Sequence, residues 1–404
     1  MPPLLPALAR LFSRARPDDL DRKASAAAPL LALNFQGKPV WTPRDYGALS
    51  REGFLRNPVV YRCVRMIAES AASVPLTLFE DGMELDRHPL LSLLETPNHR
   101  QCGTDLLESW YGFLLVSGNA YLEAVAIGRE VRELHILRPD RMKVVPGPDG
   151  WPEAFEYTAN GQSHRFSQDV VDGVRPILHM RLFHPTDDHY GLSPIEAAAF
   201  GIDTHNAAGA WNKALLDNAA RPSGALVYNA KDGNLTAEQF ERLKSDLETS
   251  FQGAANAGRP LLLEGGLSWT TLSLSPKDMD FIEAKYVAAR EIALALGVPP
   301  MLLGIPGDNT YSNYAEANRT FWRQTVIPLV KRTAKTIVGW LAPTFGADLA
   351  LRPDIDGIEA LSSEREALWK RVSEAEFLTV NEKRAAVGYG PIEGGNQFSG
   401  RDET

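Results

Sequence analysis

The sequence predicts a multi-domain α+β protein in which two long helices flank a small separate module. Three observations predict this class. The length of 404 residues is usual for two or three domains. Hydrophobic residues recur at helical spacing in several long segments, including 193–219 and 275–297. In residues 119–190, by contrast, apolar and polar residues alternate with the period of β-strands.

The first half of the chain is expected to form one α+β domain, residues 33–192, after a mobile N-terminal arm, residues 1–32. A helix begins at Asn57-Pro58, since Asn is a good N-cap and Pro is favoured in the first helical turn. Hairpin turns are expected at Asp81-Gly82 and at Asn160-Gly161, where both residue types tolerate a left-handed backbone.

Two Ser-Pro caps begin the flanking helices. Ser193-Pro194, followed by Glu196, predicts a helix over 193–219. Ser275-Pro276 predicts a second helix over 275–297, in which Gly297 can adopt the left-handed conformation that ends a helix. On the spacing alone, ordinary core helices of one domain are the favoured interpretation.

The module between these helices, residues 220–274, is predicted to be a small β-α-β-β unit. A loop over 298–313 follows the second helix. A long helix over 314–342 is expected to kink at Pro328 and to be followed by a return segment as far as residue 352. The C-terminal segment, 353–404, is predicted to contain short helices and a loose Gly-rich tail, with a capping box at Ser363 to Glu366.

Charge and cysteine content exclude several classes of protein. The net charge of -9 argues against a tight, general polyanion binder, which would carry a basic face. Two cysteines, Cys63 and Cys102, exclude a disulfide framework and a cysteine-based zinc site. Cys63 is expected to be a buried free thiol. The longest uncharged stretch, 292–307, is too short to span a bilayer, so no membrane contact is expected.

Chemical motifs are scarce. No P-loop sequence occurs, so the chain is not expected to be a motor by itself, and no cofactor is expected. The best metal-like group is His179, His184, Asp187, Asp188 and His189. The five-residue spacing puts His179 and His184 on opposite faces of a strand, which favours a solvated strand end over a metal site.

Five basic residues lie along the predicted long helix. They are Arg319, Arg323, Lys331, Arg332 and Lys335. They could contact phosphates, although charges on the exposed face of an amphipathic helix are usually only solvated. A third interpretation is that they pair with acidic residues of a neighbouring subunit.

Several segments together resemble the portal proteins of HK97-type phages. Each segment is weakly specific alone, but their order over nearly the whole chain is specific. The matching segments are Asn57–Ile67, His88–Asn98, Gly118–Tyr121, Gly191–Ile195, Asn218–Leu226, Val298–Gly304, Tyr311–Asn313, Asn381–Arg384, Gly388 and Gly394-Gly395. Asn396, where these proteins often have Asp, is a small departure.

The resemblance implies a portal fold whose copies, typically twelve, close into a ring at one head vertex of a phage or gene transfer agent. It implies these parts: wing 33–192 with 314–352, stem helices 193–219 and 275–297, clip 220–274, tunnel loop 298–313 and crown 353–404. The tunnel loop would narrow the channel through Pro300, Met301, Leu302, Asp308, Asn309 and Thr310.

The resemblance also implies partners and a location. Double-stranded DNA would pass through the ring during packaging and delivery, and the clip would dock the large terminase and later the head–tail adaptor. The major capsid protein would surround the ring in the virion, after assembly in the bacterial host cytoplasm. No enzymatic activity is expected. Two alternatives remain: a soluble hydrolase that uses His184, Asp187 and His189, and a head–tail adaptor that forms no ring.

Overall fold

The fold is described from a computed structural model of the chain. It describes residues 41–169, 173–217, 224–228, 267–271, 281–306 and 311–397, with isolated positions between 236 and 245. The expected arm, residues 1–32, lies outside the described residues.

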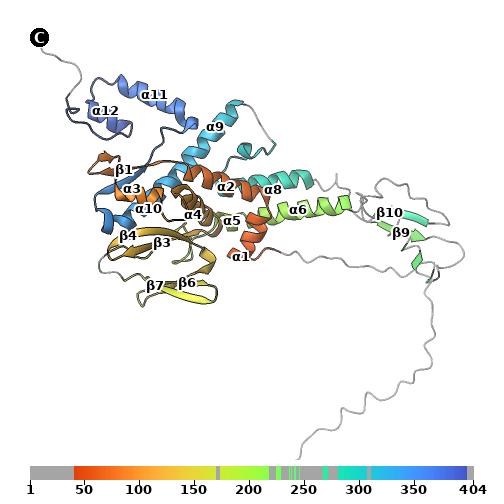
Figure 1. The fold of residues 1–404 in the computed structure, drawn as a ribbon. Helices are drawn as coiled ribbons and strands as arrows, with labels where there is room; N and C mark the ends of the chain where they lie inside the picture. The colour runs from red at the N-terminus through yellow and green to blue at the C-terminus, as the bar shows by residue number, and fades with distance from the viewer. Residues whose placement is uncertain are drawn as a thin grey trace, which may run out of the picture. The chain divides into compact units, whose positions relative to one another are not determined.

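Helices and strands are mixed along the chain (Figure 1). The α-helices are α1 (Tyr46–Leu49), α2 (Pro58–Ala72), α3 (Pro89–Glu95), α4 (Gly103–Ser117), α5 (Pro194–Ala197), α6 (Ala199–Asp217), α8 (Phe281–Leu296), α9 (Tyr311–Phe321), α10 (Ile327–Phe345), α11 (Ser362–Ser373) and α12 (Val380–Ala386). The strands are β1 (Leu76–Glu80), β2 (Met83–Leu85), β3 (Asn119–Ile127), β4 (Glu130–Leu137), β5 (Met142–Pro146), β6 (Pro152–Ala159), β7 (Gln162–Ser167), β8 (Ile177–Arg181), β9 (Gly224–Tyr228), β10 (Leu267–Thr271) and β11 (Leu349–Pro353). Short π-helical segments are η1 (Ser50–Leu55) and η5 (Trp322–Val326), and 3-10 turns are η2 (Pro139–Arg141), η4 (Pro300–Leu303) and η6 (Glu359–Leu361).

The strands form small antiparallel sheets, as expected for an α+β fold. Their orders are β11-β1-β2, β4-β3-β8, β5-β6-β7 and β10-β9. The hairpin turns occur where the sequence predicts them: Asp81 and Gly82 join β1 to β2, and Asn160 and Gly161 join β6 to β7, all four with positive φ. Pairing of β1 with β11, in which Leu78 lies opposite Leu351, brings together segments far apart in the chain.

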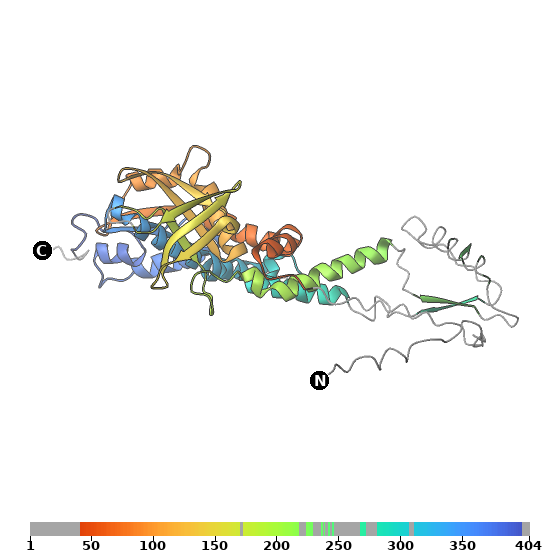
Figure 2. The same ribbon diagram turned by 90° about the horizontal axis from the view of Figure 1, so that it is seen from below.

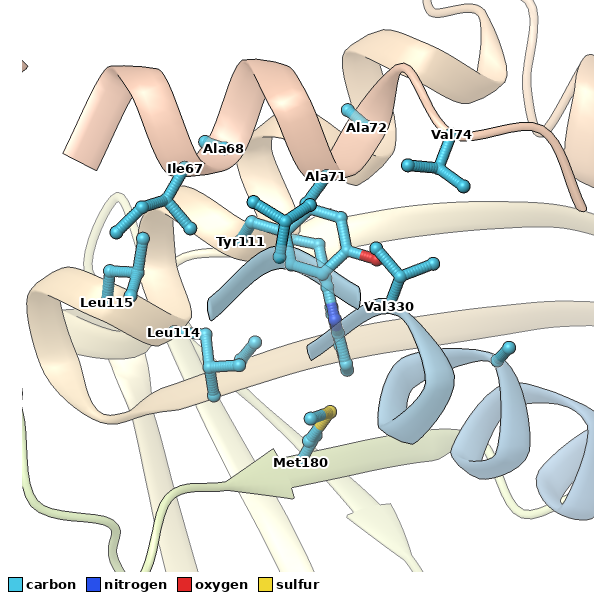
Figure 3. Packing of buried hydrophobic residues seen from close by; sticks show 14 of the residues in the cluster. Ile67, Ala68, Ala71, Ala72, Val74, Tyr111, Leu114, Leu115, Met180 and Val330 are labelled. Atoms are coloured by element: carbon cyan, nitrogen blue, oxygen red, sulfur yellow. The ribbon is translucent and has the colours of Figure 1, made fainter. Parts of the chain in front are cut away.

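One large core joins segments from both halves of the chain. Figure 3 shows side chains of α2, α4 and α10 meeting around Tyr111, with Met180 of β8 nearby. Trp110 Nε1 donates a hydrogen bond to Thr333 Oγ1 at 3.4 Å, which satisfies a buried polar group within this core. Ile202 of α6 and Ile292 of α8 belong to the same cluster, so the bases of both helices are anchored in it.

The predicted helix 193–219 is two helices. Its cap is confirmed, because Ser193 Oγ accepts a hydrogen bond from the Ile195 backbone N–H at 3.1 Å. However, Ala198 leaves helical geometry, with φ -86° and ψ 0°, and separates α5 from α6. The two pieces pack differently: α5 lies against both α4 and α8, whereas α6 lies mainly along α8 and also against η1. Tertiary packing therefore interrupts a helix that local sequence would continue.

The predicted long helix departs from the expectation in two ways. A π-helical segment, η5, separates α9 from α10, and Pro328 lies in the first turn of α10, where its missing N–H costs little. The helix also continues through Pro343 to Phe345 instead of ending before it. The capping box predicted at Ser363 is wrong, since α11 has no side-chain cap. Such a box occurs instead at Thr379 and Glu382 of α12.

The predicted module 220–274 is described only at its two ends. Strands β9 and β10 pair antiparallel, with Leu226 opposite Trp269. The expected helix of this module lies outside the described residues, apart from isolated positions between 236 and 245. The expected strand over 260–266 and the Ser275-Pro276 cap also lie outside them. Among the described helices, none is long and apolar enough to cross a membrane.

Candidate functional site

Helices α6 and α8 lie side by side and form the helix pair that the site is built on (Figures 1 and 2). Small residues allow them to approach closely. A Cβ added to Gly201 would lie 3.4 Å from the Ala288 carbonyl oxygen and 3.2 Å from Glu291 Oε2. Ala208 of α6 and Ala288 and Ala289 of α8 are buried. The contact is thus a narrow seam of small side chains, as the sequence predicted for these segments.

The segment from Trp41 to Asn57 fastens α6 to the rest of the fold. The Thr42 backbone N–H donates to Asp203 Oδ2 at 3.0 Å. Asn57 Nδ2 donates to Asn206 Oδ1 at 3.0 Å and lies 3.2 Å from His205 Nδ1. Burial lowers the pKa of His205, and the nearby Lys285 charge adds to this effect. A neutral His205 can therefore accept the Asn57 hydrogen bond.

The loop after α8 begins as the sequence predicts. Gly297 has a φ of 70°, and the Val298 N–H donates to the Ala293 carbonyl at 2.9 Å, which ends the helix. Thr325 Oγ1, in the π-helical segment η5, donates to the Gly297 carbonyl oxygen. The end of α8 is thereby tied to the start of the next long helix.

Of the six residues expected to narrow a channel, three are described and three are not. Pro300, Met301 and Leu302 form the 3-10 turn η4 and are half-buried, and Leu302 packs against the large core. They therefore form the anchored base of the loop. Asp308, Asn309 and Thr310 lie outside the described residues.

Two of the five basic residues are engaged within the chain. Arg319 Nη1 lies 2.7 Å from Glu316 Oε2, and its Nε lies 3.7 Å from Glu364 Oε1. Arg323 Nη1 lies 3.2 Å from the same Glu364 oxygen. This carboxylate of α11 therefore bridges α9 and η5. No local signal in the sequence identifies it, because Arg319 and Glu364 are more than 40 positions apart.

The other three basic residues lie on the exposed face of α10. Lys331, Arg332 and Lys335 are exposed, and among the described residues none of them has a carboxylate within ion-pair distance. Arg332 Nη2 donates to the Arg181 backbone carbonyl. The structure thus separates the five residues into a pair with ion pairs inside the chain and an exposed trio, of which Arg332 bonds to a backbone carbonyl.

The group of His and Asp residues does not converge on one point. His179 Nε2 donates to Asn119 Oδ1 at 3.0 Å, and the ring stacks on Tyr121 with centroids 4.3 Å apart. Asp187 Oδ1 accepts from the backbone N–H groups of His189 and Tyr190, at 2.7 and 2.9 Å. His184 Nδ1 accepts from the Thr186 N–H at 3.2 Å. These are contacts that shape a strand end and a turn.

A cavity of about 1540 Å³ lies between β6, β8 and α10. His179, Asp188 and His189 line it. Burial lowers the pKa of His179 to about 3, with Arg181 as the next cause, whereas a general base works best with a pKa near the working pH. In the part of the chain that the structure describes, no three His, Cys, Asp or Glu side chains are placed to hold a metal ion.

Comparisons with known proteins agree on one family. The family described as "Phage portal protein" matches residues 58–388. The portal protein of Enterobacteria phage HK97 is 26% identical over 366 residues, which cover 86% of this chain and 82% of that protein. An uncharacterized protein of Rickettsia bellii is 43% identical over 349 residues, covering 86% and 90% of the two chains.

Solved structures resemble this chain over most of its length. A chain in the neck of an empty gene transfer agent (GTA) particle, computed with C6 symmetry, is 54% identical, with a TM-score of 0.69 and coverage of 88% and 96%. The neck of the native GTA particle with C12 symmetry contains a match with a TM-score of 0.66. An HK97-family portal protein from Corynebacterium diphtheriae shares the fold, with 16% identity, a TM-score of 0.54 and coverage of 79% and 99%.

Proposed function

Because the chain belongs to the phage portal protein family, we propose that it forms a ring that encloses a channel for double-stranded DNA at one vertex of a phage-like head. The observation that carries the proposal is the 54% identical chain in the neck of a GTA particle, which covers 88% of this sequence. The virion is accordingly where this protein resides. The C12 symmetry of the native neck supports a ring of twelve copies.

We further propose which elements form the parts of the ring. The helix pair is proposed as the stem, and its seam of small residues suits two helices that must fit side by side in a narrow tube. The loop after α8 is proposed as the tunnel loop, in which six residues narrow the channel: Pro300, Met301, Leu302, Asp308, Asn309 and Thr310. Residues 353–404 are proposed as the crown inside the head.

Passage of DNA requires weak contacts. A net charge of -9 per subunit repels phosphates, so a channel of such subunits lets a duplex slide. Contact between phosphates and the basic residues is proposed for the exposed trio, Lys331, Arg332 and Lys335. Arg319 and Arg323 would contact DNA only after release from Glu364.

Portal proteins are a structural family, and this chain has no P-loop for ATP hydrolysis. We therefore assign the packaging motor to a separate protein, the large terminase, and propose that the module 220–274 is the clip that docks it. The head–tail adaptor would take the same surface after packaging, and the major capsid protein would contact the outside of the ring.

Size-exclusion chromatography and negative-stain imaging of the purified protein test the ring. Rings of a single copy number, with a central hole, are the expected result. A small compact particle at every ionic strength contradicts the proposal, because subunits that never close cannot enclose DNA.

A deletion tests the clip. Replacing residues 220–274 with a short linker is expected to leave the ring intact and to abolish binding of the terminase in a pull-down. Retained packaging by the deleted protein contradicts this assignment. A second deletion of residues 398–404 serves as the control and is expected to leave terminase binding unchanged.

A further inference from the structure

The helix pair carries a second apolar surface besides its seam. Phe200 and Ala207 are exposed on α6, two turns apart, and Val287 and Leu294 are exposed on α8 at the same spacing. Trp41 stacks on Phe200, with ring centroids 5.2 Å apart. We call these five residues the outer face. Phe200 remains 60% exposed and Leu294 79% exposed.

The direction of this face follows from the helix period. At 3.6 residues per turn, Val287 and Leu294 lie about 140–180° around α8 from Ile292 and Leu296, which are buried in the core. In the same way, Phe200 and Ala207 lie about 100–160° around α6 from His205 and Asn206, which contact Asn57. The outer face therefore points away from the core and from α2.

A smaller apolar surface lies on the α2 side of α6, the side that the outer face points away from. Leu55, at the end of η1, is 74% exposed, and Tyr61, in the first turn of α2, is 47% exposed. Phe54 and Tyr61 are in ring contact, with centroids 5.3 Å apart, which keeps Tyr61 beside η1. We call Leu55 and Tyr61 the Leu55 face. Asn206 donates to the Glu52 carbonyl at 2.8 Å, so η1 is fixed on the inner side of α6.

Two different apolar surfaces, one on the α2 side of α6 and one turned away from α2, suit a head-to-tail contact. A self-complementary contact needs only one patch and closes a dimer, whereas a repeated contact between two different patches closes a ring. We propose that the outer face of one copy packs against the Leu55 face of the next copy. The inference rests on the ring proposed above and names the residues through which neighbouring copies meet.

The chemistry of the two faces favours this pairing. Aromatic side chains are rigid and bury a large area, and they are enriched where proteins contact one another. Trp41 and Phe200 form a stacked platform on one side, and Leu55 and Tyr61 offer an aliphatic and an aromatic side chain to it. The exposed aromatic and aliphatic side chains would be covered in the ring, which explains why a soluble chain keeps them.

Cross-linking with single added cysteines tests the contact. The background variant is Cys102→Ser, because Cys102 is exposed whereas Cys63 is fully buried. Leu294→Cys and Leu55→Cys are added together, and preformed rings are treated with a short bis-maleimide. A ladder of cross-linked species up to the full ring is expected on a denaturing gel. Each single variant is expected to give only the monomer band.

The controls separate this contact from the ring itself. Phe377→Cys replaces Leu55→Cys in the control pair, because Phe377 is equally exposed but lies between α11 and α12. That pair is expected to give no ladder. Wild-type protein that forms no rings overturns the proposed function and this contact together, whereas rings without a ladder overturn only the contact. A dimer from Leu294→Cys alone shows outer face meeting outer face and also overturns it.

A second pair of cysteine substitutions is used if the first double variant does not form rings. Val287→Cys with Tyr61→Cys joins the same two faces and is expected to give the same ladder. An independent measurement is the subunit concentration at which rings form. Leu294→Asp is expected to raise it about tenfold or more, which corresponds to about 1.4 kcal/mol, because burial of an unpaired carboxylate in an apolar contact is costly. Phe377→Asp is expected to leave it unchanged, and equal concentrations for both variants contradict the contact.

Discussion

Asn119 and Gly191 are joined by two hydrogen bonds across 72 positions of the chain. Asn119 Oδ1 accepts from the Gly191 N–H at 2.8 Å, and its Nδ2 donates to the Gly191 carbonyl at 3.3 Å. The same Oδ1 accepts from His179. Ser193 Oγ, two residues further on, donates to the Leu115 carbonyl at 3.0 Å. The start of β3 is thereby fastened to the residues that lead into α5 and the helix pair.

Asn119→Ala tests this junction. The change leaves the buried Gly191 N–H and the His179 ring without their acceptor, so we expect the free energy of unfolding to fall by about 2–4 kcal/mol. Urea unfolding at a fixed subunit concentration measures it. Gln162→Ala, at the exposed start of β7, is the control and is expected to change stability by less than about 0.5 kcal/mol. Equal urea midpoints for the two variants would show that the junction contributes little.

Gly118→Ala tests the close approach beside this junction. Gly118 has a φ of 76°, and an added Cβ would lie 2.4 Å from the Gly191 carbonyl oxygen. Gly128 has a φ of 65° with open space around it. Gly128→Ala therefore isolates the backbone penalty, about 1–2 kcal/mol. We expect Gly118→Ala to cost clearly more, because the backbone must also move. Thermal melting compares the two, and identical melting temperatures would contradict the steric argument.

The sequence predicts those parts of the fold that neighbouring residues decide. The turns at Asp81-Gly82 and Asn160-Gly161, the Ser193 cap and the Gly297 helix end depend on φ angles and on bonds within one turn, and all are confirmed. Pairing of β1 with β11 is different, because it depends on which distant strand completes the sheet. No local pattern could predict it.

The same distinction applies to the candidate site. The seam of the helix pair is visible in the spacing of small residues. The π-helical segment η5 is not, because no local pattern predicts it. The ion pairs of Arg319 and Arg323 with Glu364 are not either, because they join residues more than 40 positions apart. Ser363 illustrates the error that follows: its sequence context predicts a cap, but the tertiary arrangement begins α11 at Ser362 without one.

Glu364→Gln tests the bridge between α11 and α9. The carboxylate is 42% exposed, so water and salt screen its pairs, and we expect a loss of less than about 1 kcal/mol in global stability. Local opening is the more sensitive readout. Amide hydrogen exchange in α11 is expected to speed up in the variant, and high salt is expected to have the same effect on the parent. Glu366→Gln, on the same helix, is the control, and equally fast exchange in both variants would contradict the bridge.

His179→Gln tests a pH dependence. The unfolded imidazole takes up a proton near pH 6.5, whereas burial, then Arg181 and His189, lower the folded pKa to about 3. Between these values the unfolded chain binds more protons, so stability rises with pH. The contribution of His179 to the free energy of unfolding is complete above about pH 6.5 and is lost as the pH falls towards about 3, with a slope of at most about 1.4 kcal/mol per pH unit.

Glutamine at position 179 keeps a donor for Asn119 but cannot titrate, so urea unfolding of the variant is expected to depend less on pH between about 6.5 and 4.5. If His179→Gln kept the parent's slope, the protons would be taken up by other groups, and the neutral state of His179 would not be what opposes acid unfolding.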